Sequence, residues 1–190
     1  MRKQLDRTRK QYTMCILVED IPGVLSQVSR LFSRKGYNIE SLAVGTTDDP
    51  AVSRITIEVL CGEQQVGQII NQLRKQFSVY SVRLLPPEQS IRRELVLIKV
   101  KAESREVRNE VIQIANIFRA SIIDVSTQSL TLAIIGQESK DDALEKLLAE
   151  FGILELVRTG MVALERGEAT IRNNASNKER EEFDLGKNIL

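Results

Sequence analysis

Residues 12–36 read YTMCILVEDIPGVLSQVSRLFSRKG, an apolar run that leads through a Pro-Gly turn into an amphipathic helix pattern. The run from Tyr12 to Val18 predicts a buried strand, which the turn at residues 20–23 ends. After the turn, apolar side chains recur at helical spacing and predict one helix face, made of Val24, Leu25, Val28, Leu31 and Phe32. Gly36 is suited to end this helix because glycine readily adopts left-handed backbone angles.

Residues 37–85 complete a βαββαβ order. Residues 38–44 predict a second strand, and a polar turn at 46–50 leads to a third, in which apolar and polar side chains alternate from residue 54 to residue 61. A second helix face is predicted from Val66, Ile69, Ile70, Leu73 and Phe77. Residues 79–85 predict the closing strand.

The same order repeats after residues 86–90 (PPEQS), which break both periodicities and are typical of a linker. The repeat has strands at 94–102, 122–125, 130–135 and 153–163. Its helix faces are predicted from Val107, Val111, Ile114, Ala115 and Phe118, then from Leu144, Leu147, Leu148 and Phe151. We therefore predict an α+β protein of two tandem ferredoxin-like domains, in which the sheet face opposite the helices needs a partner or polar residues.

The predicted organisation has five parts. An N-terminal extension at 1–11 precedes a first domain at 12–85, and a linker at 86–92 leads to a second domain at 93–166. The chain becomes polar from 167 to 190, where we expect a tail that is mobile or ordered by a partner.

Composition argues against several function classes. Lys and Arg total 27 against 26 Asp and Glu, so the sequence predicts no binding to nucleic acid or to an anionic membrane. The apolar runs are much shorter than the roughly 20 residues of a membrane span, and the start lacks a secretory signal, so we expect a cytosolic protein. Histidine is absent, which removes the commonest general base and metal ligand. Cys15 and Cys61 lack C-x-x-C spacing and are predicted to be reduced core thiols.

The turn at residues 20–25 (DIPGVL) has the elements of a site for a zwitterion. Free N–H groups and the positive dipole end of a helix attract a carboxylate, and Asp20 could pair with an ammonium group. Gly23 allows close approach to the backbone, while Pro22 stiffens it. On these residues alone, Asp20 could instead simply cap the helix, Pro22-Gly23 could simply turn the chain, and Asn38 could be a turn residue.

Longer stretches carry a family resemblance. Residues 19–25 (EDIPGVL), 34–42 (RKGYNIESL) and 53–57 (SRITI) closely resemble the ACT domain of acetohydroxyacid synthase (acetolactate synthase) small subunits. The likeness continues at 117–125 (IFRASIIDV) and 158–160 (RTG), so that it spans nearly all of residues 12–167.

The resemblance implies a regulatory subunit without chemistry or cofactors of its own. Its partner would be a large catalytic subunit that uses thiamine diphosphate, magnesium and FAD to condense pyruvate with a 2-oxoacid. The small subunit would raise that activity and confer feedback inhibition by valine, sometimes also by leucine or isoleucine.

The family's effector site is shared across an ACT–ACT homodimer. Carried over by motif, Asp20, Pro22, Gly23, Val24 and Leu25 would come from one protomer, and Asn38 and Ile39 from its mate. Several members have asparagine where this chain has Asp20, and an anion there should still accept from the ligand ammonium.

Three rival functions remain open. An RNA-binding module shares the βαββαβ order but needs sheet aromatics, which residues 53–59 lack. An enzyme could be imagined around Lys99, Lys101 and Glu103, although alternating charge on a solvent-facing strand is the ordinary explanation. The third rival is an amino-acid sensor coupled to another enzyme or to a transcription factor.

Overall fold

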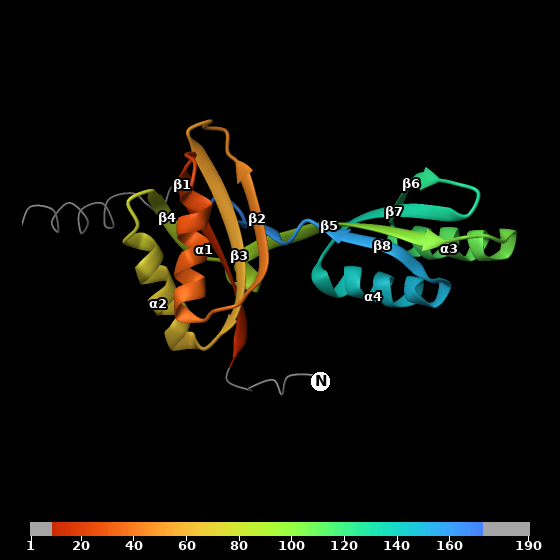
Figure 1. Ribbon diagram of the computed structural model, residues 1–190, viewed down its shortest axis with the longest axis horizontal. Helices are drawn as coiled ribbons and strands as arrows, with labels where there is room; N and C mark the ends of the chain where they lie inside the picture. Colours follow the sequence, from red (N-terminus) through yellow and green to blue (C-terminus); the bar gives the residue numbers. More distant parts are fainter. Residues whose placement is uncertain (1–8, 173–190) are drawn as a thin grey trace, which may run out of the picture. The chain divides into compact units, whose positions relative to one another are not determined.

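The computed structural model describes residues 9–172, which form two compact units. The first combines residues up to Ile91 with those from Ala163 onward, and the second is Arg92–Val162. Each unit has an antiparallel sheet with two helices on one face (Figure 1). The strand orders β2-β3-β1-β4 and β6-β7-β5-β8 are those of ferredoxin-like domains, which confirms the predicted α+β class and the tandem βαββαβ arrangement.

The first unit follows the predicted order. Its elements are β1 (Lys10–Glu19), α1 (Val24–Lys35), β2 (Ile39–Thr46), β3 (Val52–Cys61), α2 (Glu63–Arg74) and β4 (Val79–Leu84). Helix α1 ends at Lys35 and is capped by Gly36, whose φ of 69° is left-handed as expected. The helices bury Val24, Val28 and Phe32 of α1 and Val66, Ile69 and Leu73 of α2 against β1 and β3.

Phe77 was wrongly predicted to belong to the apolar face of the second helix. Helix α2 ends at Arg74, and Gln76 N–H donates to the Leu73 carbonyl in a turn that leads the chain away. The side chain of Phe77 is consequently 90% exposed. Helical spacing alone could not show that the helix ends before reaching this residue.

The second unit repeats the order. After a short 3₁₀ turn, η1 (Pro87–Gln89), it contains β5 (Ser90–Lys101), α3 (Arg105–Phe118), β6 (Ser121–Val125), β7 (Ser129–Gly136), α4 (Glu138–Leu148), η2 (Ala149–Phe151) and β8 (Ile153–Arg158). Ser104 caps α3 by accepting from Val107 N–H at 3.2 Å. Leu147 was predicted to face the core but is 43% exposed, while Phe151 packs on the core from η2.

Residues 153–163, predicted as one strand, form two. Strand β8 ends at Arg158, and β9 (Val162–Glu165) follows and also pairs with β5. Gly160 between them has a φ of 83°, a left-handed angle that interrupts an extended chain. Residues 163–172 then belong to the first unit, whereas the sequence placed residues up to 166 in the second domain; residues 173–190 of the predicted tail lie outside the described part.

The two sheets differ on the face opposite their helices. In the first unit this face is covered by residues 163–172, which we call the strap, and Cys15 beneath it has no exposed surface. In the second unit Leu95 and Leu97 on this face are partly exposed, beside an ion pair in which Lys99 Nζ lies 3.5 Å from Glu155 Oε2. Within residues 9–172, no helix is long and apolar enough to cross a membrane.

A charged cluster joins β5, α4 and β8 of the second unit. Arg158 lies 2.7 Å from carboxylate oxygens of Glu94, Asp142 and Glu145. Next to it, Asp141 is completely buried, and neither of its carboxylate oxygens has a hydrogen-bond partner among residues 9–172. Burial, followed by repulsion from Glu94, raises the pKa of Asp141 to about 6.

We expect Asp141→Asn to stabilise the second unit in a pH-dependent way. The folded pKa of about 6 exceeds the unfolded value of 3.8, so the folded chain holds its proton longer, and the wild type loses stability as pH rises between these values. Above pH 6 the variant should be more stable by the order of 2 kcal/mol, and below pH 4 the gain should vanish. Urea unfolding across this range measures it. Asp124→Asn, on an exposed side chain, is the control, and a gain independent of pH would contradict the explanation.

Candidate functional site

The corner between β1 and α1 holds Asp20 by contacts with β3 and the turn before it. Asp20 N–H donates to the Ala51 carbonyl at 2.8 Å, and the Ser53 hydroxyl donates to Asp20 Oδ1 at 3.2 Å. The N-cap of α1 is Gly23, without a side-chain cap, so Asp20 does not cap the helix. The carboxylate of Asp20 is exposed, is oriented by the hydrogen bond from Ser53, and can accept a hydrogen bond from a further donor.

The first turn of α1 presents unused backbone donors at this corner. Gly23 has a φ of 92°, and a Cβ added there would meet nothing within 4 Å. The N–H groups of Leu25 and Ser26 have no acceptor among residues 9–172, and the first turn has no acidic side chain. Free N–H groups and the positive dipole end favour an anion at this point.

The apolar residues of the corner divide between core and surface. Val24 is buried and packs into the first core, so only its backbone is available to a ligand. Pro22 is exposed, and Ile21 and Leu25 are 44% and 42% exposed. Leu25, predicted on the buried helix face, is therefore a surface residue beside the free donors.

Asn38 and Ile39 lie far from Gly23 within one chain. They follow the other end of α1, whose 12 residues span about 18 Å at 1.5 Å per residue. Asn38 Nδ2 donates to Glu40 Oε1 at 2.7 Å, and Ile39 is half-buried against the first core. One chain alone does not bring together all seven residues predicted for the site.

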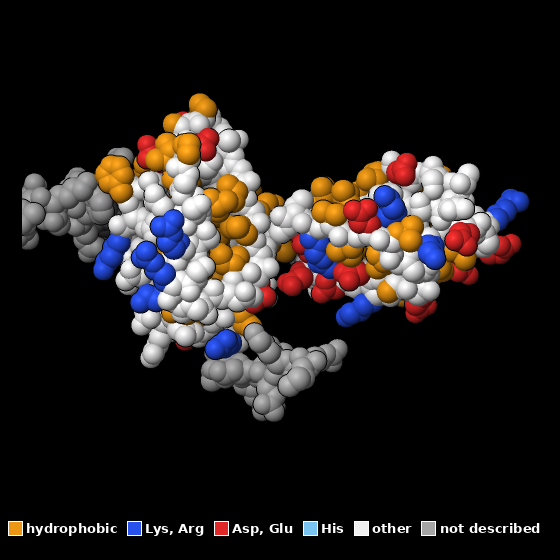
Figure 2. Space-filling view, in the orientation of Figure 1, with side chains coloured by type: hydrophobic (Ala, Val, Ile, Leu, Met, Phe, Trp, Pro, Cys, Tyr) orange, Lys and Arg blue, Asp and Glu red, His pale blue; other side chains and the backbone are white. Residues whose placement is uncertain are grey.

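Strand β2, which begins at Ile39, is an edge strand with an apolar border. Leu42 and Val44 are cross-strand neighbours of the buried Ile57 and Ile55, so they face the helix side, yet they are 36% and 49% exposed. Figure 2 shows hydrophobic side chains gathered along this edge. An open strand edge beside apolar side chains is a surface on which another strand can pair.

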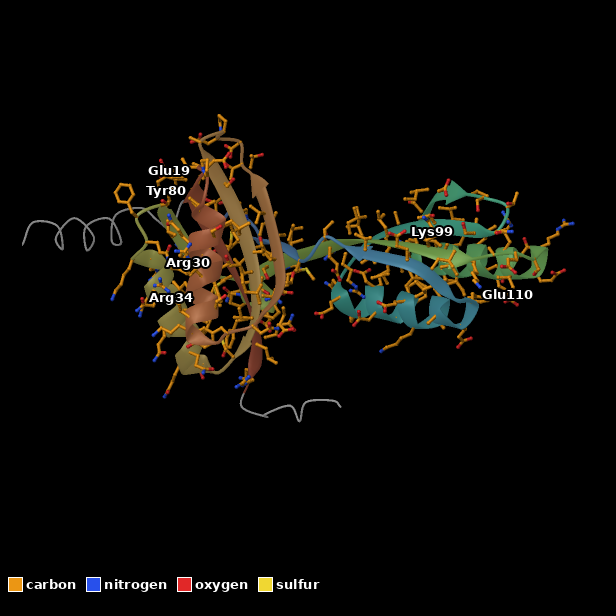
Figure 3. All side chains as sticks on the ribbon, in the orientation of Figure 1. Glu19, Arg30, Arg34, Tyr80, Lys99 and Glu110 are labelled. Atoms are coloured by element: carbon orange, nitrogen blue, oxygen red, sulfur yellow. The ribbon has the colours of Figure 1, made fainter. Side chains whose placement is uncertain are left out.

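Basic side chains follow the exposed side of α1. Arg30 and Arg34 are one turn apart and point away from the sheet (Figure 3). Backbone contacts hold the corner at the end of β1. Glu19, the last residue of β1, lies beside Tyr80 of β4 (Figure 3), and Glu19 N–H donates to the Ser78 carbonyl in the turn before β4 at 2.9 Å. Together with the contact of Asp20 N–H with the Ala51 carbonyl before β3, this contact fixes the position of the corner.

Ser53 and Ala51 were missed by the sequence reasoning. Their contact with Asp20 depends on the register of β1 with β3, in which Val18 lies opposite Ser53. A serine at the start of an alternating strand carries no local signal for this role. Cys15 and Cys61 are free and buried, as predicted, and burial raises the pKa of Cys15 to about 11.

Comparisons with known proteins agree on a family. A family profile described as the AHAS small subunit-like ACT domain matches residues 14–81, and one described as the small subunit of acetolactate synthase matches residues 93–167. The chain is 48% identical over 158 residues to the acetolactate synthase small subunit of Mycobacterium bovis, covering 83% of this chain and 94% of that protein.

More distant relatives extend the agreement. A probable acetolactate synthase small subunit of Methanothermobacter thermautotrophicus is 45% identical over 155 residues, which is 82% of this chain and 92% of that protein. The crystal structure of the small subunit from Thermotoga maritima superposes with a TM-score of 0.78 at 36% identity, covering 84% of this chain and 99% of that one. This chain belongs to the acetolactate synthase small-subunit family, and its first unit is an ACT domain.

Proposed function

We propose that this chain is a regulatory subunit that binds valine, or a closely related branched-chain amino acid, at the corner of residues 20–25 and thereby inhibits a catalytic large subunit. In the absence of the effector it raises the activity of that subunit, which would carry thiamine diphosphate, magnesium and FAD. The observation that carries the proposal is the pairing of free N–H groups at the start of α1 with the exposed, oriented carboxylate of Asp20.

The two ends of the corner match the two ends of an amino acid. The ligand carboxylate would accept from the N–H groups of Leu25 and Ser26, and its ammonium would donate to Asp20. A branched side chain would rest on exposed apolar surface such as Leu25. Charge at both ends selects for a free amino acid, because a keto acid lacks the ammonium and an amine lacks the carboxylate.

A homodimer through the ACT domains would complete the site. Strand β2 and helix α1 run in opposite directions, so pairing two β2 edges about a two-fold axis also makes the two α1 helices antiparallel. The Asn38 end of one chain would then approach the Gly23 end of its mate. This arrangement removes the separation of about 18 Å that the single chain imposes.

Inhibition requires only a difference in affinity between two states. If the amino acid binds more tightly to an arrangement in which the large subunit is less active, linkage shifts the enzyme toward that arrangement. Coupling of about 1–3 kcal/mol is typical. No residue of this chain needs to reach the distant catalytic centre.

Calorimetry of the purified chain tests the proposal directly. Valine, leucine and isoleucine should give saturable heats, whereas 3-methylbutyrate, without the ammonium, and isobutylamine, without the carboxylate, should give none at the same concentrations. The large subunit assayed with and without this chain should show activation, and inhibition by the amino acid that binds. Equal binding of the truncated analogues would disprove recognition of both charged ends.

We expect Val44→Asp to yield a monomer that does not bind valine. A carboxylate on the edge strand would be buried without a partner in the proposed interface, which is strongly unfavourable. Sedimentation equilibrium measures the association and calorimetry the binding. Ile117→Asp, at a 76% exposed position on α3, is the control and should retain both properties. A monomeric Val44→Asp that binds valine normally would exclude a shared site.

A further inference from the structure

The strap closes the outer face of the first sheet. Ala163 and Ile171 are buried in one cluster with Cys15, Leu17 and Leu85, on the side of the sheet away from α1 and α2. Leu17 and Cys15 alternate along β1 with residues of the helix-side core. The strap is therefore part of the first unit, which is assembled from two segments separated in sequence by the whole second unit.

Polar contacts hold the strap at both ends. At its start, Arg54 Nη2 donates to the Ala163 carbonyl at 2.7 Å. At its far end, Arg172 Nη1 donates to Asp48 Oδ2 at 3.0 Å, and Arg172 Nη2 lies 2.9 Å from Asp48 Oδ1 and donates to Thr47 Oγ1 at 3.3 Å. This two-pronged contact places the strap on the turn between β2 and β3.

That turn also supports Asp20. Both the N–H and the hydroxyl of Thr47 donate to the Val52 carbonyl at 3.0 Å. Ser53, the residue after Val52, donates a hydrogen bond from its hydroxyl to Asp20 Oδ1, and the Ala51 carbonyl accepts one from Asp20 N–H. Hydrogen bonds from Arg172 to Thr47, from Thr47 to Val52 and from Ser53 to Asp20, joined by the Val52–Ser53 peptide bond, thus connect the strap to the carboxylate of the candidate site.

We propose that the strap is a regulatory clamp on the effector corner: with Arg172 seated on the β2–β3 turn, Asp20 is held ready for a ligand ammonium, and release of the strap weakens effector binding. The inference rests on the proposed function. A corner ordered in advance spends less of the binding free energy on ordering. By linkage, the bound effector must stabilise the seated strap to the same extent.

The first test compares two arginines of the strap. Arg172→Gln removes the contact with the turn, while Arg166→Gln makes the same charge change at an exposed side chain. Arg172→Gln should weaken valine binding about threefold to fivefold in calorimetry, the range expected for one exposed but two-pronged ion pair. Arg166→Gln should bind like the wild type.

The second test uses Cys15 as a reporter of strap opening. Its thiol is buried beneath the strap, and burial raises its pKa to about 11, so alkylation requires the strap to open. Cys61 is buried in the helix-side core of the same unit and serves as the internal control for unfolding of the whole unit. Both rates can be followed by mass spectrometry of the same sample.

The expected results separate the clamp from the proposed function. Cys15 should be labelled about threefold to fivefold faster in Arg172→Gln than in Arg166→Gln, with Cys61 unchanged, and saturating valine should slow Cys15 labelling in the wild type. Faster labelling with unchanged valine affinity would overturn the clamp and leave the effector site intact. Absence of binding by any branched-chain amino acid to the wild type would instead overturn the proposed function, whatever the labelling shows.

Discussion

Gly23→Asp is expected to abolish valine binding. The new carboxylate would lie at the start of α1, where the ligand carboxylate is proposed to bind. Two like charges about 4 Å apart near a protein surface repel by about 4 kcal/mol. We therefore expect the dissociation constant to rise by about 100-fold or more in calorimetry, and inhibition of the holoenzyme by valine to disappear while activation persists.

Gly23→Asn is the matched control for this variant. Asparagine has the same shape as aspartate and carries no charge, and both are among the non-glycine residues found most often at left-handed angles such as the 92° of this position. An added Cβ meets nothing within 4 Å, and both variants place a non-glycine residue at the same left-handed φ, so the backbone strain is shared and the difference between them reports the charge. Equal loss of binding in both variants would contradict the electrostatic explanation, and unchanged valine affinity in Gly23→Asp would place the pocket elsewhere.

Arg158→Met is expected to destabilise the second unit by roughly 3 kcal/mol, the range for breaking a buried ion pair. Arg158 is the cation that Glu94, Asp142 and Glu145 share, and Glu94 is almost fully buried. Removing it leaves Glu94 without its charged partner beside the buried Asp141. Urea unfolding followed by circular dichroism measures the change in the free energy of unfolding.

Two further variants test whether the loss of stability in Arg158→Met comes from the buried charge of Glu94. Lys99→Met removes the exposed pair with Glu155, whose side chains are 41% and 65% exposed, and should change stability by less than about 1 kcal/mol. Adding Glu94→Gln to Arg158→Met should recover part of the loss, because a neutral amide replaces the isolated charge. If the double variant is as unstable as the sum of the two single variants, the charges are not coupled.

Local patterns were sufficient for most of the fold. Apolar side chains recur every two residues in a strand with one covered face and about every 3.6 residues in a helix, and both spacings can be seen in the sequence without tertiary information. The end of α1 at Gly36 and the left-handed Gly23 also follow from local backbone preference. Local patterns failed where α2 ends before Phe77, although the helical spacing continues, and where Gly160 divides the predicted last strand.

The candidate site was predicted only in part. The turn at residues 20–25 is continuous in sequence, so its helix start and its acidic side chain could be found together. The support of Asp20 by Ser53 depends on the register between β1 and β3, and the distance from Gly23 to Asn38 depends on the length of α1. Neither relation has a counterpart in the spacing of residue types.

The sequence by itself determined the order of strands and helices, the position of the turn that precedes α1, and the family. It did so because these features depend on neighbours only a few residues apart or on long matched stretches. The tertiary structure decided that residues 163–172 close the ACT sheet, that Arg158 serves three carboxylates, and that one chain cannot bring Asn38 to Gly23. Those outcomes arise from contacts between segments that are distant in sequence, whose geometry is set only when the sheets pair and the cores pack.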